Sequence, residues 1–189
     1  MMGRSSFSSL CAAISLSVLF SLATSPASAE ITHSFLGLGK ANQAVIVAED
    51  GTVQWKFEKP ASDGWVLPSG NVLLALYPTE GFPGGGVVEV DRETKKIVFQ
   101  YQGQQKEIST VQPLPKGQFL VAELGPEPRA LVIDRKGKIL KSTPLQCQTN
   151  NFHMQTRMLR VLPNGNYIAP HLLDFAVKEY DPNTGKVLG

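Results

Sequence analysis

The segment Trp65-Val-Leu-Pro-Ser-Gly-Asn-Val-Leu-Leu-Ala75 returns twice in this 189-residue sequence, as Gln112-Pro-Leu-Pro-Lys-Gly-Gln-Phe-Leu-Val-Ala122 and as Arg160-Val-Leu-Pro-Asn-Gly-Asn-Tyr-Ile-Ala169. The prolines of the three copies, Pro68, Pro115 and Pro163, are 47 and 48 residues apart. In each copy an apolar stretch leads into a turn with glycine two positions after proline, and a second apolar stretch follows. Each copy is therefore predicted to form a β-hairpin.

A second pattern alternates with the first and occurs four times, in residues 45–55, 88–99, 131–140 and 177–188. In each occurrence an aspartate ends one apolar stretch and a short turn precedes the next. Because an aspartate side chain can accept backbone N–H bonds within a turn, these residues are interpreted as turn residues rather than metal ligands: Asp50, Asp91, Asp134 and Asp181. Two hairpins per 47 residues make a four-stranded antiparallel unit, and sheets repeated with this spacing are the blades of a β-propeller.

About four blades are predicted, and the first and last of them are incomplete. Strands are expected at 34–39, 44–48 and 52–57; at 64–67, 71–77, 87–90 and 96–101; and at 108–114, 118–123, 130–133 and 138–141. The first blade lacks an innermost strand, and the fourth begins near Gln155 and reaches its outer strand as the sequence stops at Gly189. We therefore expect a fragment or truncated product of a propeller with roughly six to eight blades.

Residues 1–29 have the pattern of a secretory signal peptide. Arg4 is followed by an apolar run from Leu10 to Ala23 and by the small residues Ala27-Ser28-Ala29. The run is shorter than the roughly 20 apolar residues that span a bilayer, and Cys11 stands at its start, whereas a lipidation cysteine would stand at its end. Cleavage between Ala29 and Glu30 is predicted. It leaves a partial propeller domain at 30–189, secreted or periplasmic and without a membrane span.

The composition excludes several classes of protein. With 42% hydrophobic and 18% charged residues, the chain is not disordered, not a coiled coil and not a multi-pass membrane protein. The predicted mature chain has 17 Lys and Arg against 16 Asp and Glu, so no basic stripe remains that would bind nucleic acid. Its only cysteine, Cys147, has no nucleophile motif around it and is interpreted as an inert thiol.

The alternation of Leu-Pro-x-Gly hairpins with Asp-x-x-Gly-Lys hairpins resembles secreted bacterial β-propeller proteins of the quinoprotein-like (PQQ-like) repeat class, from about Ile31 onward. Arylsulfotransferase-type propellers are similar in the same hairpins. The resemblance implies an aromatic docking residue four positions after the turn glycine. Trp55 fits and Phe99 fits in part, whereas Lys141 and Gly189 stand at the other two positions. The cofactors PQQ and calcium are not supported, because no run of cation-ligating polar residues accompanies the repeats.

The candidate ligand site lies on the rim that carries the long connections between strands, because long loops on a rigid scaffold usually bear binding groups. The longest connection, 142–155, leads to His153, Gln155 and Arg157, whose side chains would project to one side of an extended strand. Glu123 and His171 stand at equivalent positions near the ends of two strands. These five residues are the predicted ligand-binding set. The alternative is that they hydrogen-bond loop backbones between adjacent blades.

The run Gly84-Gly85-Gly86 also lies in a connection, and no Gly-Lys-Ser/Thr follows it. We interpret it as a flexible loop rather than a phosphate-binding loop. A divalent cation held by Glu123, His171 and His153 would resemble lactonase-type propellers, but no ligand spacing is diagnostic and no metal is predicted.

The expected function is a binding or scaffold module whose partner is an unknown small molecule, a carbohydrate or an envelope protein. The alternative is an exported enzyme of lyase, lactonase, sulfotransferase-like or quinoprotein-like type, acting on a small or carbohydrate substrate. In that case histidine would supply a base and arginine a cationic group for carboxylate or sulfate. A truncated chain without independent function is the third hypothesis.

Overall fold

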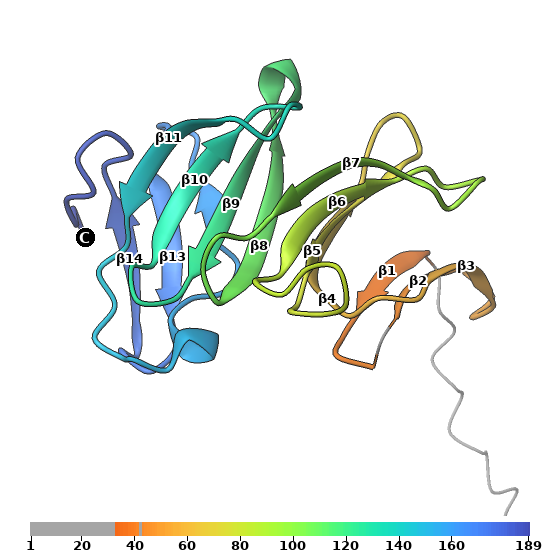
Figure 1. The fold of residues 1–189 in the computed structure, drawn as a ribbon, viewed down its shortest axis with the longest axis horizontal. Coiled ribbons are helices and arrows are strands. Elements are labelled where there is room, and N and C mark those ends of the chain that lie inside the picture. The colour runs from red at the N-terminus through yellow and green to blue at the C-terminus, as the bar shows by residue number, and fades with distance from the viewer. Residues whose placement is uncertain (1–32, 42) are drawn as a thin grey trace, which may run out of the picture. The chain divides into compact units, whose positions relative to one another are not determined.

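The computed structural model describes residues 33–41 and 43–189, and all of these belong to one compact unit, Ile31–Gly189. The predicted signal peptide and its cleavage site lie outside the described residues. Within them, fourteen strands form four antiparallel sheets that follow one another along the chain (Figure 1). The predicted all-β architecture of successive blades is therefore confirmed.

Each sheet consists of strands that are neighbours in the sequence. The first sheet contains β1 (Phe35–Leu38), β2 (Ala44–Val47) and β3 (Val53–Phe57). The second contains β4 (Ala61–Val66), β5 (Val72–Leu76), β6 (Gly86–Val90) and β7 (Ile97–Gln102), and the third contains β8 (Glu107–Leu114), β9 (Gln118–Leu124), β10 (Arg129–Ile133) and β11 (Ile139–Pro144). The fourth contains β12 (Arg160–Val161), β13 (Tyr167–His171) and β14 (Ala176–Tyr180). Short 3-10 helices form at η1 (Pro115–Gly117) and η2 (Phe152–Met154). In the part of the chain that the structure describes, no helix has the length and apolar character needed to cross a membrane.

Both kinds of hairpin turn have the predicted chemistry. The glycines that follow proline all have φ between +69° and +89°, a range that favours glycine, at Gly70, Gly117 and Gly165. The four turn aspartates accept backbone N–H bonds, as expected for Asp50, Asp91, Asp134 and Asp181. For example, hydrogen bonds from the Thr52 hydroxyl and backbone hold the pKa of Asp50 below its ordinary value. The turns are thus specified locally, by residues that the repeat conserves from blade to blade.

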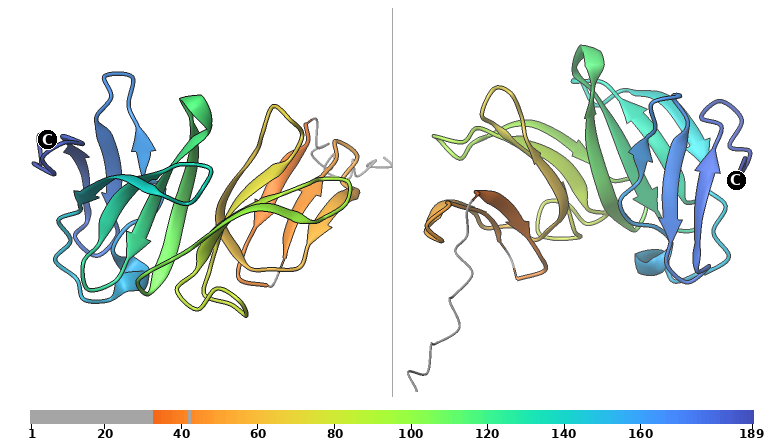
Figure 2. Two further views of the ribbon diagram at one scale, coloured as in Figure 1. Left: turned by 45° about the horizontal axis from the view of Figure 1, so that its top comes forward. Right: turned by 180° about the vertical axis from the view of Figure 1, so that it is seen from behind.

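Apolar clusters lie between successive sheets, which pack face to face (Figure 2). Side chains alternate along a strand, so Leu74 of β5 packs with Ile46 of the first sheet, whereas its neighbour Leu73 packs with Val121 of the third. Leu120, beside Val121, in turn packs toward the fourth sheet. Because β5 is buried on both faces, its sequence is continuously apolar rather than alternating.

A buried ion pair joins the first strands of three sheets. Asp63 of β4 is 4% exposed, and its carboxylate accepts hydrogen bonds from both terminal nitrogens of Arg160 in β12, at 2.8 and 3.0 Å. The same carboxylate accepts the backbone N–H of Val111 in β8 at 3.1 Å. One side chain of the second sheet therefore binds both the third and the fourth sheet.

The prediction of an inner strand in the fourth sheet is wrong for the first residues of that strand. Residues 152–154 form η2, Gln155 has α-helical backbone angles, and β12 begins only at Arg160. The polar side chains here bond to other segments, since the Thr156 hydroxyl donates to Pro170 O at 2.6 Å, and this favours a compact turn over an extended strand. The predicted outer strand is represented among the described residues by one isolated bridge, between Tyr180 and Val187.

The Gly84-Gly85-Gly86 run is buried and is not the flexible loop that the sequence predicts. The Gly103 N–H, in the connection between β7 and β8, donates to Gly85 O at 3.0 Å. A Cβ atom on Gly84 would lie 2.7 Å from Gly103 O. Glycine is needed here because two backbone segments approach too closely for a side chain to fit between them.

Candidate functional site

Side chains from four segments of the chain meet on the rim of the long connections. Lys40 stands between β1 and β2, Tyr77 follows β5, and Glu107 begins β8. His153 belongs to η2, and Arg157 lies between η2 and β12. We call these five residues the rim cluster. The sequence analysis placed the candidate site on this rim, and two members of the rim cluster, His153 and Arg157, belong to the predicted set.

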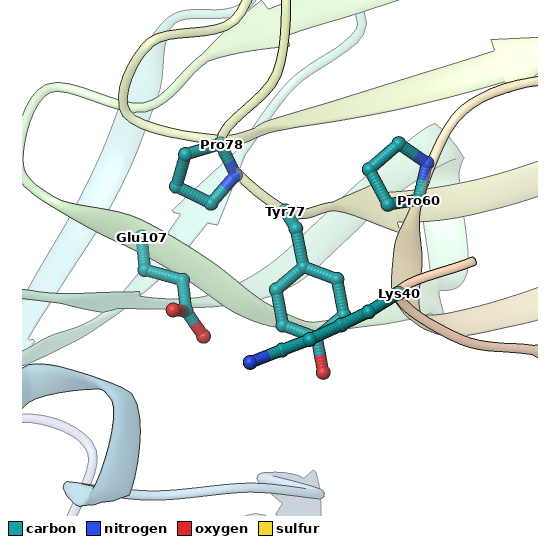
Figure 3. A pocket seen from close by; sticks show the side chains of 5 residues that line it. All are labelled: Lys40, Pro60, Tyr77, Pro78 and Glu107. Carbon is teal, nitrogen blue, oxygen red and sulfur yellow. The ribbon is translucent and has the colours of Figure 1, made fainter. Parts of the chain in front are cut away.

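An open pocket of about 280 Å³ lies beside the rim cluster, lined by Lys40, Pro60, Tyr77, Pro78 and Glu107 (Figure 3). The Lys40 ammonium, the Tyr77 hydroxyl and the Glu107 carboxylate extend to the same side of the pocket in this view, and the two prolines flank Tyr77. The pocket therefore combines an apolar wall with polar groups of both charges, a combination typical of small-molecule sites.

Glu107 is the centre of the rim cluster. Its side chain is 4% exposed, and its two oxygens bind two partners: Arg157 Nη2 at 2.9 Å and His153 Nδ1 at 2.8 Å. The Arg157 guanidinium also donates to Thr156 O at 3.2 Å. A buried carboxylate is tolerated only with such partners. Glu107 therefore fixes the positions of both predicted residues.

The imidazole of His153 lies among three charged side chains. Its Nδ1 is 2.8 Å from a Glu107 oxygen, which only accepts hydrogen bonds, and 2.7 Å from Arg157 Nη2, which only donates them. Its Nε2 is 3.1 Å from the Lys40 ammonium and 3.2 Å from Arg157 Nη2. Glu107, Arg157 and Lys40 together orient the imidazole.

Tyr77 lies between the two cations of the rim cluster. The Lys40 ammonium is 5.4 Å from the centre of the Tyr77 ring, and the Arg157 guanidinium carbon is 6.0 Å from it. These distances fall within the range of cation–π attraction. Burial raises the pKa of Tyr77 above its ordinary value, although the charge of Arg157 opposes this. The hydroxyl is therefore a hydrogen-bond donor at neutral pH.

The sequence predicts that Gln155 projects to the same side as His153 and Arg157, but the structure places its side chain elsewhere. Its buried amide donates to Gly125 O at 2.9 Å and accepts the Gly125 N–H at 3.0 Å. The helical turn at η2 directs this side chain toward the loop after β9. Gln155 therefore hydrogen-bonds loop backbone between two blades, which was the alternative interpretation of these polar residues.

Glu123 stands near the end of β9, as predicted, but it is fully buried away from the pocket lining. Its carboxylate accepts a hydrogen bond from Arg129 Nε at 2.8 Å and another from the backbone N–H of Gln104. Gln104 lies in the connection between the second and third sheets. These contacts give Glu123 the geometry of a structural ion pair.

His171 occupies the equivalent position at the end of β13 and is 1% exposed. Its Nδ1 donates to Gln155 O at 2.9 Å, and its Nε2 accepts the Tyr180 hydroxyl at 2.8 Å. Cys147 Sγ lies 3.1 Å from the same Nδ1, a neighbour that the sequence did not indicate. Because Nδ1 already carries a proton, His171 does not activate the thiol, and burial raises the pKa of Cys147 to about 11.

The buried imidazole of His171 predicts a pH dependence of stability. Burial lowers the pKa of His171 below its ordinary value of 6.5, although the bond to the Gln155 carbonyl opposes this. Below about pH 6.5 the unfolded chain takes up a proton that the folded chain does not, so the free energy of unfolding decreases as pH falls toward the folded-state pKa. We expect the urea midpoint to decrease between pH 7 and pH 5 more steeply in the wild type than in His171→Gln. Equal slopes in the two proteins would contradict the prediction.

No group of three or more His, Cys, Asp or Glu side chains arranged to hold a metal ion occurs within residues 33–41 and 43–189. Glu123, His171 and His153 each bind different partners in the structure. The structure does not bring these three residues together as a cation site.

Three members of the rim cluster were not predicted from the sequence: Lys40, Tyr77 and Glu107. Glu107 gave a usable signal, because it is an acidic residue directly before the apolar start of a buried strand, on the rim already singled out. Tyr77 and Lys40 gave none, since an aromatic residue after a strand and a lysine in a loop are common on any surface.

Comparison with solved structures identifies the architecture. A protein of unknown function from Bacteroides caccae matches with a TM-score of 0.70 and 22% sequence identity, over 83% of this chain and 56% of that one. The WD40 β-propeller domain of Doa1 matches with a TM-score of 0.60 and 14% identity, over 77% of this chain and 46% of that one. This chain has a β-propeller fold. At these identities the likeness extends to the fold alone.

The chain spans about half the length of these two solved structures. No protein-family model matches the sequence, and no curated protein matches it significantly.

Proposed function

We propose that this chain is an exported β-propeller binding module of the quinoprotein-like repeat class, and that its ligand binds in the pocket beside the rim cluster. One observation carries the proposal: Lys40, Tyr77 and Glu107, from separate segments of the chain, line one open pocket, and His153 and Arg157 bind the Glu107 carboxylate beside it. The ligand would be a small molecule, a carbohydrate group or a group on an envelope protein.

The rim cluster differs from the ion pairs of Asp63 and Glu123 in what it leaves accessible to solvent. Asp63 and Glu123 are buried carboxylates that bind backbone N–H groups as well as arginine, so their role in holding sheets together is apparent. In the rim cluster the His153 side chain is 33% exposed, and Lys40 is exposed. Polar groups that are held in place yet reachable from solvent are suited to binding.

Two further observations support the repeat class and export. Trp55 and Phe99, which stand at the aromatic docking positions that the resemblance implies, are buried in the clusters between sheets. The charged start, apolar run and small-residue end of residues 1–29 support export with cleavage after Ala29. The mass of the protein recovered outside the cytoplasm tests this part, since the proposal expects a chain that begins at Glu30.

Ligand binding is tested by a thermal-shift screen of small acids, sugars and amines, repeated on His153→Ala and on the control His33→Ala. His33 is an exposed histidine outside the pocket lining. We expect a compound that raises the melting temperature of the wild type and of His33→Ala but has much less effect on His153→Ala. Because the imidazole is partly exposed and Arg157 still binds the Glu107 carboxylate, His153→Ala itself should unfold within a few degrees of the wild type. A large drop in its melting temperature, with ligand shifts unchanged, would assign His153 a structural role and contradict the proposal.

An exported enzyme is the second candidate, and the Glu107–His153 pair favours it. A carboxylate that orients an imidazole beside a pocket is an arrangement suited to general-base chemistry. An enzyme of lyase, lactonase, sulfotransferase-like or quinoprotein-like type should lose turnover in His153→Ala and in Arg157→Ala while both variants bind substrate and remain folded. A binding module has no turnover to lose, so the same two variants separate the candidates.

A further inference from the structure

The charges around the pocket do not balance. Glu107 is the one carboxylate among the lining residues, and its oxygens already bind Arg157 and His153. The Lys40 ammonium has three hydrogens to donate, and His153 Nε2 lies 3.1 Å from it. Within the described part of the chain, no carboxylate lies within ion-pair distance of Lys40. The pocket therefore presents a cation that protein groups leave without a counter-charge.

A second donor stands beside this ammonium. The Tyr77 hydroxyl extends to the same open side as the Lys40 nitrogen (Figure 3), and the structure gives it no hydrogen-bond partner among residues 33–41 and 43–189. Because the hydroxyl keeps its proton at neutral pH, it can donate to a ligand oxygen. Over the Tyr77 ring, the guanidinium of Arg157 adds a positive charge that Glu107 holds in place.

We propose that the group recognised in this pocket is an oxyanion of a small ligand, a carboxylate or a sulfate, which accepts hydrogen bonds from Lys40 Nζ and the Tyr77 hydroxyl. This inference rests on the proposed binding function and specifies its ligand class. The charge-assisted bond from Lys40 is the stronger of the two hydrogen bonds. Pro60 and Pro78 flank Tyr77 and would contact the apolar part of the same ligand.

The charge pattern argues against the opposite ligand class. A cationic ligand would meet the charges of both Lys40 and Arg157, and the carboxylate that could bind it is already occupied. A neutral ligand would leave the ammonium in a more enclosed site without a counter-charge, which is unfavourable. An oxyanion removes both difficulties at once.

The test is a titration followed by NMR, in which sodium acetate and sodium sulfate are added to the purified chain against sodium chloride at matched ionic strength. Acetate tests the planar carboxylate, and sulfate tests the tetrahedral oxyanion. We expect saturable shifts of the signals of Lys40, Tyr77 and His153 with at least one of the two anions. Lys40→Ala should weaken that binding about ten-fold and Tyr77→Phe about five-fold. The control Lys136→Ala removes the same charge from an exposed turn at the opposite ends of the strands and should leave binding unchanged.

Two results would overturn the inference. The first is the absence of saturable shifts with both anions, and the second is binding that Lys40→Ala and Lys136→Ala weaken equally, because this would reflect only the net charge of the protein. The proposed function is tested separately. The screen could also give a neutral compound whose binding depends on His153 but not on Lys40. That result would support the binding function and show that the ligand is not an oxyanion.

Discussion

Asp63→Ala is expected to lower the free energy of unfolding by about 3–5 kcal/mol, the range observed when one partner of a buried ion pair is removed. The carboxylate accepts both terminal nitrogens of Arg160 and the backbone N–H of Val111. Without it, a guanidinium that is 22% exposed and a buried N–H lose their partner together. Chemical denaturation followed by tryptophan fluorescence measures the change, and Trp65 beside Arg160 makes the signal sensitive to this site.

Two further variants show whether the loss comes from the unpaired charge. In the double variant Asp63→Ala/Arg160→Met no buried charge is left alone, so it should be more stable than Asp63→Ala. Asp63→Asn keeps one acceptor oxygen and should fall between the wild type and Asp63→Ala. If Asp63→Ala costs less than about 1 kcal/mol, the bond between sheets contributes little, as at an exposed pair.

The sequence predicted the sheets well because their signals are local. A proline, a glycine two residues later and flanking apolar stretches specify each first hairpin, and the glycine at Gly117 has the positive φ that such a turn requires. The aspartates of the second hairpin bind their own turns, as Asp134 does with the Lys136 N–H. Such signals repeat every 47 or 48 residues, so one error in a strand boundary does not change the order of strands.

The errors occurred where side chains from distant segments decide the backbone. Gln155 was placed on a strand because its neighbours alternate, but its amide bonds to Gly125, thirty residues earlier, and η2 forms instead. The buried glycines of residues 84–86 were placed in a flexible loop, because nothing in the local sequence indicates that the backbone of Gly103 packs against them. Both segments depend on contacts between consecutive sheets, which no hairpin pattern encodes.

Two of the five members of the rim cluster were predicted, for the same reason. His153 and Arg157 were found because topology places the long connections on one rim. Their partner Glu107 lies 46 residues from His153, near one repeat away but not at the equivalent repeat position. Lys40 reaches the same imidazole from 113 residues away. Polar residues gathered from separate blades can be assigned to a rim from sequence, but the pairs that they form require the packed structure.

Gly103→Ala is expected to be the most damaging of the glycine substitutions between blades, with a loss of about 3 kcal/mol in the free energy of unfolding, the upper part of the range for overpacking. A Cβ atom at Gly103 would collide with the backbone oxygen and carbon of Gly84 and approach the Ile108 side chain at 3.1 Å. Backbone atoms cannot rotate away as a side chain can. The collision must therefore separate the connections before β6 and β8 and break the hydrogen bond from Gly103 to Gly85.

Gly39→Ala is the matched control, because a Cβ there meets nothing within 4 Å and the backbone is not in the left-handed region. This variant should unfold within about 0.5 kcal/mol of the wild type, or slightly above it, since alanine restricts the unfolded chain. Urea denaturation of the two variants under the same conditions gives the comparison. Because Glu107 begins β8 four residues after Gly103, displacement of that connection should also move the carboxylate that holds His153 and Arg157. Equal stability of the two variants would mean that the connections separate freely, and the rim cluster would then lack the rigid support on which a preorganised site depends.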